Sequence, residues 1–178
     1  MSNARILADL MGTSTTVPTA KLPTIPSSKL SLTTADMPTG SVLQVVSQEH
    51  TGTGISTTST SYEASGHLLS ITPSSTSSKI LVQLSGGHIS YASTPDFLRV
   101  RFYRKIGSGS YSDQTGDLLS CRPSSSYGMH MSAIYFDSPA TTSEVTYQVY
   151  IRSGNGYNVH YNQTLDLQVQ LTLMEIAG

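Results

Sequence analysis

The sequence predicts an all-β protein, with an antiparallel β-sandwich or jelly-roll head joined to an extended N-terminal arm. From residue 41 onward, short segments alternate apolar and polar residues between turns rich in Ser, Thr and Gly. Residues 1–36 lack this alternation and contain several prolines, which favour extended backbone. We therefore divide the chain into an anchoring arm, residues 1–36, and a β-sandwich head, residues 37–178.

The arm contains two kinds of segment. Residues 4–11 predict one short helix, which is too short to be stable alone and so needs a partner surface. Residues 13–36 predict an extended strap with apolar side chains at intervals. We expect the apolar side chains of both segments to anchor the arm: Ile6, Leu7, Leu10, Val17, Leu22, Ile25 and Leu30.

The head contains seven or eight predicted strands. Residues 165–176 show the most regular alternation, with Leu or Val at every second position from Leu165 to Leu173. Residues 154–156, Gly-Asn-Gly, predict a hairpin turn between two strands. The other strand segments are residues 41–49, 68–72, 79–85, 97–104, 129–136 and 145–152.

The outward strand positions are unusually poor in charge. Charged residues make up 12% of the chain, against about 25% in typical domains. Neutral amides and tyrosines can pack and hydrogen-bond across a subunit interface. The predicted outward residues of this kind are Gln83, Gln148, Gln168, Gln170, Tyr103 and Tyr150. We expect a homo-oligomer, specifically a homotrimer.

Tyrosines in turn-rich segments are candidate ligand contacts. Tyr111, Tyr127 and Tyr157 lie among Ser, Gly and Asn, a combination typical of binding loops because the ring offers a large contact area at little entropic cost. A host surface glycan would suit such loops. The alternative is that these rings only cover the bases of their loops.

Residues 99–105 combine basic and aromatic side chains. Arg99, Arg101, Arg104 and Lys105 surround an aromatic pair and could bind phosphate or an acidic glycan. Because Arg99 and Arg101 alternate with apolar residues, the favoured interpretation is that these two arginines lie on one polar face of the strand, which pairs with nearby carboxylates.

No pattern in the sequence predicts catalysis, a cofactor or a metal site. The five histidines are dispersed, and Asp113 and Asp117 lack the alternating carboxylates of a calcium loop. The formal net charge of −1 argues against nucleic acid as a partner, and the absence of an 18-residue apolar run argues against membrane insertion. Cys121, the single cysteine, excludes an intrachain disulfide and is expected to be a small buried residue.

Five segments resemble structural proteins of tailed bacteriophages, particularly tail-fibre and appendage proteins of phages that infect marine bacteria and cyanobacteria. They are residues 4–10 (ARILADL), 37–46 (MPTGSVLQVV), 71–81 (ITPSSTSSKIL), 136–143 (FDSPATTS) and 171–176 (LTLMEI). The resemblance implies a location on the exterior of the virion. It also implies an arm that binds other virion proteins of the capsid or tail, and a head exposed to the host.

Three functions follow as alternatives. The first is a short fibre or appendage that contacts the host surface. The second is a capsid cement or decoration protein that stabilises the shell. The third, a glycan-cleaving enzyme, is disfavoured because no convergent acidic cluster can be identified.

Overall fold

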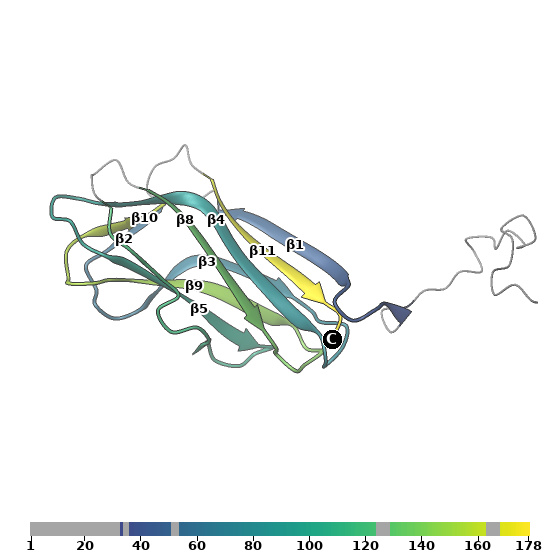
Figure 1. Ribbon diagram of the computed structural model, residues 1–178. Coiled ribbons are helices and arrows are strands. Elements are labelled where there is room, and N and C mark those ends of the chain that lie inside the picture. Colours follow the sequence, from purple (N-terminus) through teal and green to yellow (C-terminus); the bar gives the residue numbers. More distant parts are fainter. Residues whose placement is uncertain (1–32, 34–35, 51–53, 124–128, 163–167) are drawn as a thin grey trace, which may run out of the picture. The chain divides into compact units, whose positions relative to one another are not determined.

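The computed structural model describes residues 33, 36–50, 54–123, 129–162 and 168–178. The chain divides into two units, Met1–Ala35 and Asp36–Gly178. The second unit is the head, and its fold is all-β (Figure 1). The anchoring residues proposed from the sequence, from Ile6 to Leu30, and the short helix of residues 4–11 lie outside the described residues.

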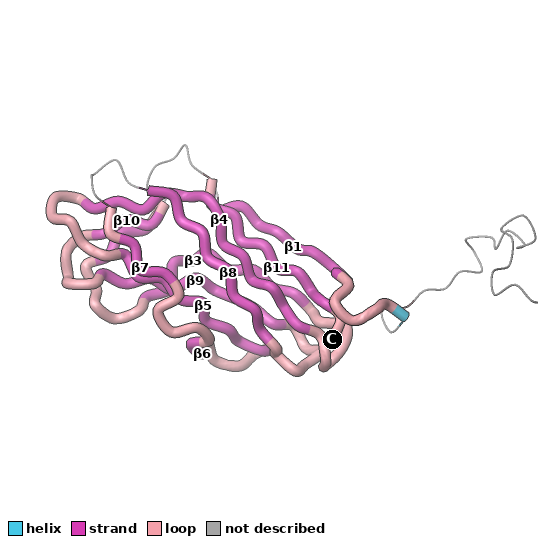
Figure 2. The backbone as a smooth tube through the Cα atoms, viewed as in Figure 1, coloured by secondary structure: helices cyan, strands magenta, loops and turns pink. Residues whose placement is uncertain are grey.

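Two antiparallel sheets make up the head (Figure 2). Sheet A contains β1 (Val42–His50), β2 (Ile55–Thr57), β4 (Lys79–Tyr91), β8 (Met129–Asp137), β10 (Val159–Tyr161) and β11 (Val169–Ile176). Sheet B contains β3 (Glu63–Ile71), β5 (Leu98–Ile106), β6 (Ser112–Asp113), β7 (Leu119–Cys121) and β9 (Val145–Ser153). The predicted antiparallel β-sandwich is confirmed.

Strand β4 organises sheet A because it pairs with three other strands. Its first half pairs with β11 on one side and β8 on the other, and its last residues pair with β10. A register shift lies between these halves, where Gly86 and Gly87 adopt φ values of 84° and 71°. A Cβ atom on Gly86 would lie 2.3 Å from the main-chain oxygen of Gln168, so this position requires glycine.

The core lies between the two sheets. Alternate residues of β4 and β11, such as Leu84 and Leu171, face alternate residues of β5 and β9, such as Phe102 and Ile151; all four are fully buried. Burying a side chain of this size stabilises the fold by about 1.5–3 kcal/mol. The half-buried Cys121 packs against this core as a free thiol, and burial raises its pKa.

Two fully buried carboxylates fasten loops to the sandwich. Asp96 accepts hydrogen bonds from the Ser153 hydroxyl and from the main-chain nitrogens of Phe97, Asn155 and Tyr157. Burial acts to raise the pKa of Asp96, but these hydrogen bonds outweigh it and hold the pKa below its usual value.

Glu175, on β11, has the same role for a second loop. It accepts hydrogen bonds from the side chain of Gln44 and from the main chain and hydroxyl of Ser74. Burial opposes ionisation here too, yet the donated bonds keep the pKa of Glu175 lowered. The carboxylate therefore ties the loop after β3 to β1 and β11.

Three details differ from the sequence-based expectations. Residues 154–156 do not form a hairpin turn, because β9 pairs within sheet B and β10 within sheet A, so this turn crosses between sheets. Gln148 is buried, at 6% exposure, because β9 is an inner strand of sheet B and Gln148 lies between Tyr103 on β5 and Leu68 on β3. The short strands β2, β6, β7 and β10 have too few residues to show an alternating pattern.

Candidate binding surface

The outer face of sheet B carries the densest group of polar contacts among the described residues. On β5, Leu98, Val100 and Phe102 point into the core, so Arg99, Arg101 and Tyr103 point outward. The register of β5 with β9 sets Arg99 beside Arg152 and Arg101 beside Tyr150. The strand pairing thus places basic and aromatic side chains in adjacent rows.

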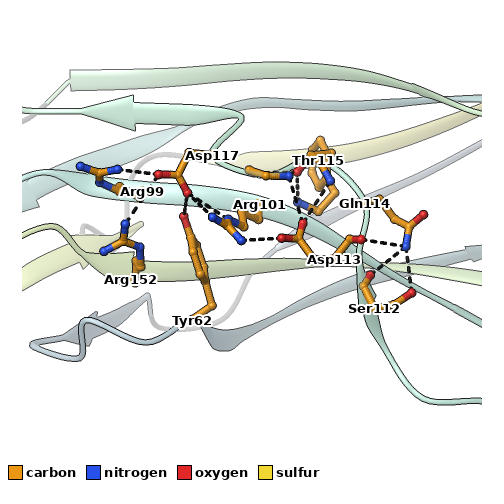
Figure 3. Close-up of polar contacts among 11 residues, drawn as sticks. Tyr62, Arg99, Arg101, Ser112, Asp113, Gln114, Thr115, Asp117 and Arg152 are labelled. Carbon is orange, nitrogen blue, oxygen red and sulfur yellow. Dashed lines mark hydrogen bonds and ion pairs between the residues drawn. The ribbon is translucent and has the colours of Figure 1, made fainter.

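The loop between β6 and β7 brings two carboxylates over these strands. Main-chain nitrogens of Gln114 and Leu118 donate to the carbonyls of Phe102 and Val100, at 3.0 and 3.2 Å. Asp113 accepts bonds from the main-chain nitrogens of Thr115 and Gly116, which close the turn. The loop is therefore held against β5, and Asp113 and Asp117 both lie next to the guanidinium group of Arg101 (Figure 3).

Asp117 is the centre of an ion-pair network. Its Oδ1 lies 2.7 Å from Nη2 of Arg101, and its Oδ2 lies 2.5 Å from Nη1 of Arg99 and 3.6 Å from Nη2 of Arg152. The Tyr62 hydroxyl also donates to Asp117, and Arg101 makes a second ion pair with Asp113. Three guanidinium groups therefore face two carboxylates, and the network keeps an excess of positive charge.

Four tyrosines extend this network into a row. The rings of Tyr103 and Tyr150 are stacked with centroids 3.9 Å apart. Tyr111 lies 6.2 Å from Tyr150, and Tyr62 lies 6.5 Å from Tyr103. Basic groups cap both ends of the row: Arg101 lies 4.2 Å from the Tyr62 centroid, and Lys105 lies 5.3 Å from that of Tyr111.

We call this group the Arg–Tyr surface. It consists of Tyr62, Arg99, Arg101, Tyr103, Lys105, Tyr111, Asp113, Asp117, Tyr150 and Arg152.

The electrostatics of the network keep the Asp117 carboxylate ionised. The hydrogen bond from Tyr62, together with Arg101 and Arg99, holds the pKa of Asp117 well below its usual range despite the opposing effect of burial. Burial and the bond to Asp117 raise the pKa of Tyr62, so its hydroxyl stays protonated as a donor. A general acid needs a raised pKa, which Asp117 does not have. The arrangement suits binding through fixed charges and rings.

The three tyrosines predicted to contact a ligand do not form one group in the described part of the structure. Tyr111 belongs to the Arg–Tyr surface, whereas Tyr157, at 50% exposure, lies in the turn after β9 that Asp96 holds. Tyr127 lies outside the described residues. Pairing of the arginines with carboxylates is confirmed for Arg99 and Arg101, and also for Arg104, which binds Asp137 at 2.7 Å.

Sequence reasoning missed the role of Tyr62 and the association of Tyr103 with Tyr150. The alternation of residues 97–104 indicated that Arg99, Arg101 and Tyr103 share a face. It could not show that β9 is the neighbour of β5, nor that Tyr62, which precedes β3, reaches the same place.

Other kinds of site find no support within the part of the chain that the structure describes. No group of three or more His, Cys, Asp or Glu side chains there could hold a metal ion. The described residues also include no helix with the length and apolar character needed to cross a membrane.

Comparisons with known proteins give only distant likenesses. No family model matches the chain, and no curated protein matches it. A xylan-binding domain, CBM22-1 of Paenibacillus barcinonensis Xyn10C, is 10% identical with a TM-score of 0.38, and the match covers 80% of this chain and 99% of that domain.

Capsid structures of infectious bursal disease virus also match. The VP2 subviral particle is 12% identical with a TM-score of 0.35, and the match covers 78% of this chain but 34% of that one. The Gx strain structure is 9% identical with a TM-score of 0.28, over 79% and 41% of the two chains. These likenesses are too remote to carry an argument about function.

Proposed function

We propose that this chain is a virion structural protein, anchored through residues 1–36, whose β-sandwich head contacts a glycan on the host surface. The observation that carries the contact is the Arg–Tyr surface on the outer face of sheet B. The virion location rests on the resemblance to tailed-phage fibre and appendage proteins. The homotrimer predicted from the charge-poor strands belongs to the same proposal.

The chemistry of the surface fits a saccharide. Planar guanidinium groups and carboxylates present donors and acceptors side by side, which suits neighbouring hydroxyl groups. Tyrosine rings offer apolar contact for the C–H faces of a sugar ring, and each hydroxyl adds a polar contact. The network is built before a ligand arrives, so little side-chain entropy is lost on binding.

The same features support binding over cleavage. Asp113 and Asp117 each bind Arg101, and the pKa of Asp117 is lowered. Neither carboxylate therefore has the environment of a general acid for glycoside hydrolysis. We accordingly propose a non-enzymatic role.

The test is binding of the full chain to a microarray of neutral and acidic bacterial surface polysaccharides. Replacing Tyr111 and Tyr150 together with Ala should weaken binding at least tenfold, because both rings of one end of the row are lost. The matched control is Tyr91→Ala, a half-exposed tyrosine on sheet A. Thermal melting of each variant separates loss of contact from loss of fold. Equal binding by the double variant and the wild type would contradict the proposal.

A capsid decoration protein is the second candidate, and the outer face of sheet A favours it. Large apolar side chains such as Ile134 and Val45 are more than half exposed there, which is typical of a protein that packs against others. A decorating subunit bound only to the assembled shell stabilises that shell by linkage. Particles without the protein should then burst at a lower temperature, and the isolated head should bind no host glycan. Antibody labelling of intact particles would distinguish a shell location from a tail location.

A further inference from the structure

The outer face of sheet A carries a continuous apolar row. Val45 pairs with Met174, Met174 with Leu81, and Leu81 with Phe136, so one row crosses all four strands β1, β11, β4 and β8. The row faces outward because the neighbouring Ile80, Val82, Leu173 and Glu175 point into the core. Val45 and Phe136 are 54% and 49% exposed.

Further apolar residues broaden this row in both directions. Val42 pairs with Ile176 on one side of it, and Ile134 lies on the other side, two residues before Phe136. Val42 is 51% exposed and Ile134 56%. We call the set the sheet A patch: Val42, Val45, Leu81, Ile134, Phe136, Met174 and Ile176.

Formal charge is nearly absent from this face. Among the outward positions of the described parts of β1, β4, β8 and β11, only Glu49 and Lys79 are formally charged at neutral pH. Glu49 lies at one end of the sheet, whereas Lys79 borders the apolar residues: it pairs with Ile176, and its Nζ lies 5.7 Å from the centroid of the Phe136 ring. The remaining positions carry Ser, Thr, Gln and His, including Ser47 and Thr172, which hydrogen-bond each other at 2.9 Å. Covering the apolar residues with another surface would therefore bring one formal charge, that of Lys79, to the edge of the contact and desolvate no other.

The dimensions of the face match an interface between protein subunits. Four strands about 4.8 Å apart and eight residues of about 3.3 Å each give roughly 500 Å² per copy. Two such faces together bury about 1,000 Å², the lower bound for a specific interface. A single extended segment, as predicted for residues 13–36, is about one strand wide and would leave most of the face uncovered.

We propose that the sheet A patch is buried against a second copy of this chain. Self-packing places apolar side chains on apolar side chains, and it needs no oppositely charged partner. The inference names the surface of the proposed homo-oligomer and rests on that part of the proposed function, and it is the alternative to packing of the same face on a capsid shell. It is independent of glycan binding, because the patch and the Arg–Tyr surface lie on the outer faces of different sheets.

The test is the mass of the full chain in solution, measured by light scattering after gel filtration at about 10 µM. The wild type should have the mass of two chains if two patches pack face to face, or of three chains if, as in the predicted homotrimer, each patch is shared between two neighbouring copies. Replacing Val45 and Ile134 together with Lys should give the mass of one chain, since two charges would enter the interface. A matched pair, Leu68→Lys with Ile106→Lys, changes exposed apolar residues of sheet B and should leave the mass unchanged.

A second variant, with a smaller change in side-chain polarity, tests the patch in case the Lys variant does not fold. Val45→Thr with Ile134→Thr keeps β-branched side chains, which suit strands, and should raise the dissociation constant at least tenfold. Circular dichroism should show the same fold for all variants. A monomeric wild type, or a Val45→Lys, Ile134→Lys protein that keeps the wild-type mass, would overturn the inference. So would a sheet B control that dissociates equally.

Discussion

The outer faces of the two sheets differ in how their side chains are paired. On sheet B, arginines, aspartates and tyrosines bind one another, so that face is complete within one chain. On sheet A, Val45, Ile134 and Phe136 are about half exposed in the part of the chain that the structure describes. The comparison teaches that a sandwich with one core can offer a prebuilt polar surface for a ligand and an apolar surface for another subunit.

The largest expected effect lies in the core that both sheets share. His67 is 2% exposed, its Nδ1 lies 3.0 Å from the Tyr161 hydroxyl, and its ring stacks on His50 at 5.0 Å. Burial, with a smaller contribution from the neighbouring His50, lowers the pKa of His67 to about 4. Its value in the unfolded chain is about 6.5.

Acid should therefore weaken the core before it disrupts the sheet B network. The unfolded chain binds the proton first, so stability falls as pH drops below about 6.5 and has lost about 3 kcal/mol by pH 4. Urea unfolding at several pH values measures the slope. His67→Gln should flatten it, and exposed His130→Gln should not. A wild-type slope of zero over this interval would contradict the lowered pKa of His67.

The second largest effect concerns the loss of a carboxylate, which should cost more stability on the outer face of sheet B than on that of sheet A. Asp117→Ala leaves three guanidinium groups facing one carboxylate, and we expect it to lower the free energy of unfolding by about 2 kcal/mol. Glu49→Ala, at an exposed position on sheet A, should change it by less than about 0.5 kcal/mol. Chemical denaturation compares the two variants directly. Equal costs would mean that the sheet B network contributes no more than a solvated charge.

Salt should distinguish the two faces as binding sites. Raising NaCl from 0.1 to 1 M shortens the screening length from about 10 to about 3 Å. An acidic polysaccharide bound to the positively charged Arg–Tyr surface should then bind at least threefold more weakly, whereas self-association through the sheet A patch should be unchanged or stronger. Titration calorimetry and light scattering on one sample measure both. If 1 M NaCl weakened polysaccharide binding and self-association equally, the two faces would not differ in their dependence on charge.

The smallest expected effect concerns the arm. Among the residues that the structure describes, the buried apolar residues of the core lie between Ile71 and Ala177. Deleting residues 1–36 should therefore change the free energy of unfolding of the head by less than about 0.5 kcal/mol. Thermal and urea unfolding measure this. The truncated protein should nevertheless fail to enter virus particles, if residues 1–36 anchor it. Normal copy number of the truncated form in purified particles would contradict the anchoring role.

Local sequence patterns predicted most of the long strands. They could not predict contacts between residues that are distant in the sequence. Alternation marked the inner residues of β4, β5 and β11, because a strand buried on one face repeats every two residues. Asp117 was visible only as an acidic residue beside a glycine. Its partners Tyr62 and Arg152 come from segments 55 and 35 positions away, and only sheet pairing brings them together.

The outward faces illustrate the same limit. Gln148, Tyr103 and Tyr150 were grouped as one neutral face for association, but the structure buries Gln148 and joins the two tyrosines to charged residues. The apolar row of sheet A involves Val45 and Leu81, which the sequence shows as parts of continuous apolar runs. Alternation with the inner residues Ile80 and Val82 places Leu81 outward, whereas the outward position of Val45 depends on the bulge in β1 after Val42 and on the register with β11.

The paired glycines in the middle of β4 have a consequence for protein engineering. Gly86 and Gly87 let one strand change partners midway, so β10 and β2 form a short strip that joins sheet A only beyond this point. A foreign loop grafted between β2 and β3, or in the turn before β10, would perturb that strip while the four-stranded half before Gly86 keeps its register. The head could in this way serve as a display scaffold with one variable end.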